Sequence, residues 1–173
     1  MTATTRTARK GLFARLFGGT APLTEPLYAA IVAEGRRPGW YRDCAVPDTI
    51  DGRFDMIAII FSLVALRLER EPPDGPADAV RLTERFIDDM DGQMRELGFG
   101  DLVVGKQVSG IMGALGGRMG ALREGTTAEA LARNLWRGSP PDAATLDRTR
   151  MQIEALRARI DATPLPALMI GQW

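Results

Sequence analysis

The sequence predicts an all-α fold, a single-domain helical bundle of about six helices, on three observations. Apolar residues recur at three- and four-residue spacing along nearly the whole chain, and no segment shows the sustained alternation of a half-buried strand. The 173 residues suit one domain with one core. A content of 45% hydrophobic and 25% charged residues is typical of a globular protein.

The first half of the chain predicts three helices. The first runs from about residue 26 to residue 36, with Thr24 as the candidate N-cap. An irregular aromatic stretch, residues 38–48, leads to a second helix that ends near residue 70, before a proline-rich loop. Residues 56–66 of this helix are apolar except for one serine. This run is too short to cross a membrane, and it predicts a buried central helix.

The third helix is expected over residues 76–97, with an apolar stripe that includes Val80 and Phe86. The fourth starts around residue 101 and contains six glycines, each of which costs a helix interior about 1 kcal/mol relative to alanine. The glycines predict either close packing against a neighbour or local mobility. They are Gly105, Gly110, Gly113, Gly116, Gly117 and Gly120.

Two more helices and a tail complete the expected bundle. Thr126 and Glu129 have the spacing of a capping box, which predicts a short fifth helix ending at residue 138. The sixth follows residues 139–142. The tail beyond residue 162 holds two prolines and is expected to be irregular, packing across the bundle as an extended strap.

The N-terminal segment, residues 1–24, differs from the helical domain expected over residues 25–173. It is basic, with no acidic residue before Glu25, and a short helix would gather its apolar side chains on one side. This pattern predicts a membrane-surface contact, and a transit peptide or a solvated tail are the alternatives. The residues expected at the membrane surface are Arg9, Lys10, Leu12, Phe13, Arg15, Leu16 and Phe17.

Composition disfavours several functions. The chain has 22 basic and 22 acidic residues, whereas DNA-binding proteins usually carry a basic excess, so no DNA partner is expected. It has no histidine, which is the commonest general base and the commonest metal ligand. Its one cysteine, Cys44, excludes an internal disulfide. We therefore expect no cofactor, no metal and no enzymatic activity.

Two motifs still carry possible chemistry. Residues 100–106 have the glycine and lysine spacing of a P-loop, but Gln107 stands where the magnesium-binding hydroxyl belongs and no strand precedes the motif. Asp48, Asp51 and Asp55 stand close enough in sequence for acid–base work, which keeps a small enzyme as one alternative. They also suit the start of a helix, where carboxylates favour the positive end of the dipole.

Three blocks of sequence carry a family resemblance. The most specific is Val46-Pro47-Asp48-Thr49 followed by Asp51-Gly52-Arg53-Phe54-Asp55-Met56. Trp40-Tyr41 precedes it, and Arg133-Asn134-Leu135-Trp136-Arg137-Gly138 is a further block. With these blocks the chain resembles the ubiquinol–cytochrome c chaperone family. Members often carry a histidine near the position of Ile60 and a tyrosine at that of Gly116, and this chain has neither.

The resemblance implies an all-helical, non-catalytic assembly chaperone for respiratory complex III, with newly made cytochrome b or another apolar protein as client. Mitochondrial members work with a small co-chaperone and the ribosome, and by analogy both are expected partners. The expected location is the cytoplasm, at the inner face of the membrane, or alternatively the mitochondrial matrix. A stable scaffold or regulatory subunit of another complex is the second alternative. The residues expected to contact a partner at the surface are Trp40, Tyr41, Arg53, Gly117 and Arg118. For Trp40 and Tyr41 the alternative is that they cap the core, since aromatic side chains serve both roles.

Overall fold

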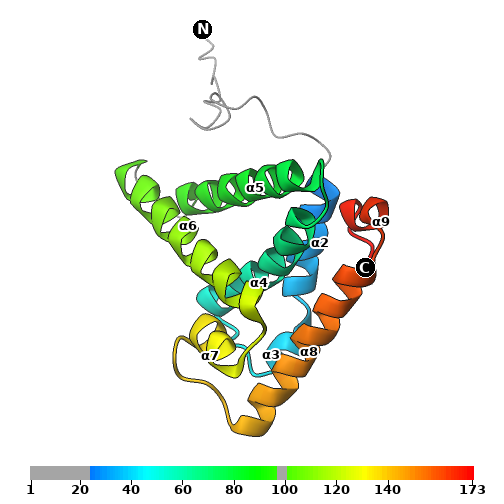
Figure 1. The fold of residues 1–173 in the computed structure, drawn as a ribbon. Coiled ribbons are helices and arrows are strands. Elements are labelled where there is room, and N and C mark those ends of the chain that lie inside the picture. The colour runs from blue at the N-terminus through cyan, green and yellow to red at the C-terminus, as the bar shows by residue number, and fades with distance from the viewer. Residues whose placement is uncertain (1–23, 97–100) are drawn as a thin grey trace, which may run out of the picture.

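Every regular element in the computed structural model, which describes residues 24–96 and 101–173, is a helix (Figure 1). The described residues form six helices of nine or more residues and two of five, which confirms the predicted all-α bundle. The longer ones are α2 (Glu25–Gly35), α4 (Ile50–Glu69), α5 (Gly75–Glu96), α6 (Asp101–Glu124), α7 (Ala128–Trp136) and α8 (Ala143–Ala162). The short ones are α3 (Pro38–Arg42) and α9 (Leu165–Met169).

Helix α4 is the centre of the molecule, with α2, α5, α6, α7 and α8 packed around it. Its first turn is capped by the Thr49 side chain, which accepts a hydrogen bond from the Gly52 amide at 3.1 Å. Residues 55–66 are all buried, as predicted for a helix that is apolar on every side. The buried Ser62 hydroxyl has a hydrogen-bond partner within the same helix, because it donates to the Ala58 carbonyl at 2.7 Å.

Helix α5 covers one side of α4 with Leu82, Phe86 and Met90. The Phe86 ring lies 4.9 Å from the Phe61 ring of α4, centroid to centroid. Val80 was expected in this buried stripe, and that expectation is wrong, since its side chain is 58% exposed. The three buried residues fix which side of α5 faces the core, and Val80 falls on the opposite side.

Helix α6 contacts α4, α5 and α7, and over residues 110–124, where its side chains are described, one side is buried and includes Leu115 and Leu122. An added Cβ would have no neighbouring atom within 4 Å at any of five glycines, namely Gly110, Gly113, Gly116, Gly117 and Gly120. Of the two alternatives that the sequence left open for these glycines, close packing is therefore wrong at all five positions, as judged against the described residues. Residues 101–106 of the P-loop-like stretch, and Gln107 after them, belong to this helix.

Three local expectations are corrected. The stretch after residue 37, expected to be irregular, begins with the short helix α3. The N-cap of α7 is Thr127, one residue later than predicted, and its hydroxyl accepts from the Ala130 amide at 3.1 Å. The C-terminal tail contains the helix α9 and lies against α2, with Gly171 so near Ala30 that a Cβ there would stand 2.4 Å from the alanine Cβ.

Across residues 24–96 and 101–173, no helix has the length and hydrophobicity required to cross a membrane. The membrane-surface residues predicted in segment 1–24 lie outside the described residues.

Candidate functional site

The loop between α3 and α4 is fixed by contacts with the C-terminal half of the chain. Trp136, the last residue of α7, donates its indole N–H to the Ala45 carbonyl at 2.8 Å. The Thr149 hydroxyl of α8 lies 3.1 Å from the Cys44 carbonyl. Ala45 adopts the left-handed conformation, with φ of 51°, which is uncommon outside glycine. These long-range contacts position the loop that leads into the first turn of α4.

Glycine at position 52 allows this loop to press against α4. A Cβ there would lie 2.0 Å from the Pro47 carbonyl oxygen, so no larger residue fits without moving the backbone. The same first turn carries Asp51 and, one turn on, Asp55. The family-like block around residues 46–56 is therefore one compact structural unit.

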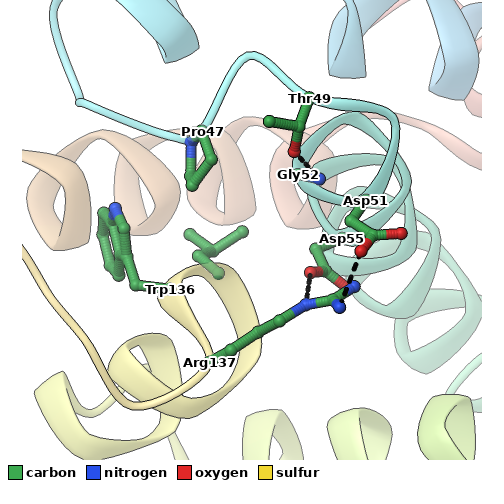
Figure 2. Close-up of a pocket in the computed structure, with 8 residues that line it drawn as sticks. Pro47, Thr49, Asp51, Gly52, Asp55, Trp136 and Arg137 are labelled. Atoms are coloured by element: carbon green, nitrogen blue, oxygen red, sulfur yellow. Dashed lines mark hydrogen bonds and ion pairs between the residues drawn. The ribbon is translucent and has the colours of Figure 1, made fainter.

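Asp55 is the centre of a charged network that joins α4 to α6 and to Arg137, the residue that follows α7. Figure 2 shows the part of it that Arg137 forms with Asp51 and Asp55. Its carboxylate is 1% exposed and accepts a hydrogen bond from the Arg118 guanidinium of α6. The Arg137 Nε group donates to its other oxygen at 3.1 Å, and Arg137 Nη1 reaches Asp51 at 2.8 Å. Arg137 follows α7 in the left-handed conformation, with φ of 51°.

Burial and charge act in opposite directions on this network. Burial raises the pKa of the Asp55 carboxyl, while the guanidinium groups of Arg118 and Arg137 favour its charged form. Burial also lowers the pKa of Arg118, and the Asp55 carboxylate opposes that shift. A buried ion pair is stable only with good geometry and further hydrogen bonds, so the second arginine matters for the charge on Asp55.

A pocket of about 140 Å³ borders this network. Figure 2 shows Arg137 reaching across toward Asp51 and Asp55, with Trp136 and Pro47 on the other side. The lining residues are Pro47, Thr49, Asp51, Gly52, Asp55, Leu135, Trp136 and Arg137. The volume is well below that of a typical small-molecule site, and the carboxylates on its wall are already paired.

The three carboxylates of the possible enzyme site do not converge. Asp48 lies outside this pocket and pairs with Arg53 at 2.6 Å. Asp51 and Asp55 share Arg137, which leaves neither of them as an unpaired general acid or base. In the part of the chain that the structure describes, no three histidine, cysteine, aspartate or glutamate residues are grouped to hold a metal ion.

The predicted partner-contact residues near α3 fall into two groups. Tyr41 is half-buried and donates its hydroxyl to the Gly35 carbonyl, and the exposed Arg53 guanidinium stands 5.7 Å from the Tyr41 ring centre. Trp40, expected on the surface, is only 4% exposed and donates its indole N–H to the Glu34 carbonyl at 3.0 Å. The surface expectation is wrong for Trp40 because its ring fills the core and its polar atom is satisfied inside.

The other predicted pair lies on α6. Gly117 is exposed, whereas the next residue, Arg118, is only 8% exposed and its guanidinium lies 5.7 Å from the Phe54 ring centre. The expectation of a surface position is therefore wrong for Arg118, because it turns inward to neutralise Asp55. Tyr41, Arg53 and Gly117 remain accessible, whereas Trp40 and Arg118 are buried.

Sequence reasoning missed the pairing of Asp55 with Arg118 and Arg137. These partners stand 63 and 82 residues from Asp55 along the chain, and no periodic pattern connects them. One signal was present: Asp55 and Arg137 both lie in blocks that resemble the same family. The available clue was Asp55 at the start of an apolar helix, together with Arg137 at the end of the predicted fifth helix.

Comparison with known proteins assigns the class of this protein. The family model described as ubiquinol-cytochrome C chaperone matches residues 42–173, so the chain belongs to that family. The match includes the loop, the first turn of α4 and the entire Asp55 network.

A solved relative extends the likeness to nearly the whole fold. The crystal structure of the Cbp3 homolog from Brucella abortus is 28% identical in sequence, with a TM-score of 0.71. The similarity covers 92% of this chain and 92% of that chain. No curated protein matches the sequence.

Proposed function

We propose that this protein is a non-catalytic assembly chaperone for respiratory complex III, and that its client is newly made cytochrome b. The observation that carries the proposal is the family match over residues 42–173 together with the likeness to the Cbp3 homolog over 92% of each chain. The site agrees with this role because the buried Asp55 is paired with arginines that link α4 to α6 and to the end of α7, an arrangement suited to maintaining the fold.

The accessible residues around the first turn of α4 are the proposed contact surface for a partner. Arg53 has a side chain that is 55% exposed, and it lies over Tyr41 and beside Asp48. An arginine next to a half-buried aromatic ring presents both charge and apolar area, and both residue types are enriched at protein interfaces. Gly117 of α6 is a further proposed contact.

The N-terminal segment is proposed to place the chaperone at the inner face of the cytoplasmic membrane, with the mitochondrial matrix as the alternative location. Its basic residues would meet anionic headgroups and its leucine and phenylalanine side chains would enter the interface. Cytochrome b is a membrane protein, so this placement would bring the chaperone to its client. By analogy with mitochondrial family members, a small co-chaperone and the ribosome are proposed partners.

Site-specific photo-crosslinking in the native host tests client and surface together. A photoreactive amino acid replaces Tyr41 or Arg53, with the matched control at Met151, a 58% exposed residue on α8. We expect adducts with cytochrome b from the first two positions during a short labelling pulse, and their loss during the chase. Adducts that persist at constant stoichiometry with a mature complex would instead favour the scaffold role.

A further inference from the structure

The outward face of α5 carries both apolar and acidic side chains. Val80 is 58% exposed there, and Ile87, Glu84 and Asp88 are partly exposed on the same side of the helix. Glu84 and Asp88 make no hydrogen bond or ion pair with another described residue, although Arg85 lies near enough to act on the charge of Asp88. The helix contains six acidic and three basic residues.

The N-terminal segment has the complementary chemistry. Residues 1–23 hold four basic residues and no acidic one, and Leu12, Phe13, Leu16 and Phe17 would share one side of a short helix. Helices this short are marginal in water alone, and an apolar surface that also bears opposite charge would stabilise one. The positive charge and apolar side chains of the segment therefore complement the negative charge and apolar side chains on the outward face of α5.

The N-terminal segment leads directly into α2, whose start lies beside α5, so the segment can reach the outward face of α5. Glu25, the first residue of α2, forms an ion pair with Arg85 of α5 at 2.7 Å. Tyr28 of α2 donates to Asp89 of α5 at 2.8 Å, so the start of α2 is held beside α5. The six residues between Phe17 and Thr24 span up to roughly 20 Å. The distance along α5 from Val80 to Asp88 is roughly 12 Å.

We propose that the outward face of α5, formed by Val80, Glu84, Ile87 and Asp88, is the docking surface for this chain's own N-terminal segment, residues 6–17. Tethering makes the contact intramolecular, with an effective concentration in the millimolar range, so weak individual contacts suffice. The docked segment uses the same side chains that would meet an anionic membrane. Docking and membrane contact therefore exclude each other, whichever client the chaperone serves.

Paramagnetic relaxation in the full-length protein tests this contact. A nitroxide on A14C, with the buried Cys44 left in place, should broaden the amide signals of Val80, Glu84 and Ile87 and spare the outer side of α8. In the E84K/D88K double variant, the docked-to-free ratio should fall roughly fivefold, as expected for the loss of two exposed ion pairs. The matched control is E154K, a partly exposed glutamate of α8 that has no ion pair among the described residues.

The result that would overturn the proposal is equal broadening of α5 and α8, or broadening unchanged by E84K/D88K. Broadening of α5 that grows with protein concentration would also overturn it, since the occupant would then be the segment of a second copy. A second experiment without the nitroxide excludes a labelling artefact by comparing the amide spectra of the wild type and the R9E/K10E/R15E variant. The substitutions should shift the α5 amide signals of the full chain, and unchanged signals would contradict the contact.

Discussion

Helices α4 and α6 are similar in length but are stabilised differently. The side chains of α4 are buried all round from residue 55 to residue 66. Helix α6 is buried on one side, and its five glycines from Gly110 to Gly120 face open space. Helix propensity would favour alanine at those positions, so packing gives no reason for glycine there. The difference separates residues that maintain the fold from residues that packing leaves unconstrained.

The largest expected effect comes from opening a cavity in α4. Phe61→Ala removes a fully buried ring that contacts Phe86, and it should lower the free energy of unfolding by about 3–5 kcal/mol. Chemical denaturation followed by circular dichroism measures this change. On α6, the 39% exposed Met112 gives the matched control, since Met112→Ala should change the same quantity by no more than about 0.5 kcal/mol. Equal losses would mean that the contrast between the two helices is wrong.

The next effect concerns the network that joins the two helices. Arg118→Met leaves the buried Asp55 with Arg137 as its remaining cation, and it should cost about 3 kcal/mol of stability. Adding Asp55→Asn should restore part of that loss, because the charge that needed neutralising is gone. A double variant as unstable as the sum of the two single variants would show that the two residues do not interact.

Two glycines should respond with opposite signs. Gly117→Ala should stabilise the protein by about 1 kcal/mol, because the added methyl group meets no atom and alanine favours the helix. Gly52→Ala should destabilise it by about 1–3 kcal/mol, because its Cβ would overlap the Pro47 carbonyl. The midpoint of thermal or urea unfolding measures the change in stability of each variant. A gain at both positions would refute the close approach of the loop to α4.

The smallest effect is expected at the exposed pair of Arg53 and Asp48. Both side chains are more than half exposed, so water and salt screen the attraction between them. Asp48→Asn should leave the urea midpoint unchanged within error and insensitive to added salt. A clear loss of stability would assign the pair a structural role in place of the proposed role in partner contact.

The sequence predicted the helices better than it predicted the site. Helical spacing and caps located α4 to within a residue or two, and the apolar run predicted its burial, because both are local properties. The surface position of Arg118 was wrong because its burial depends on Asp55, a partner far along the chain, and that of Trp40 was wrong because its ring packs into the core. The glycines of α6 left two alternatives open, close packing or local mobility, because a sequence does not show whether a neighbour lies against them.

The abundance of assembled complex III and of cytochrome b, after deletion of the gene in its native host, tests the central claim most directly. The account predicts loss of both with normal cytochrome b transcript, and recovery when the intact chain is supplied. Recovery should be weaker with a chain that carries Tyr41→Ala and Arg53→Ala but folds normally. Unchanged complex III and cytochrome b in the deletion strain would contradict the assembly role.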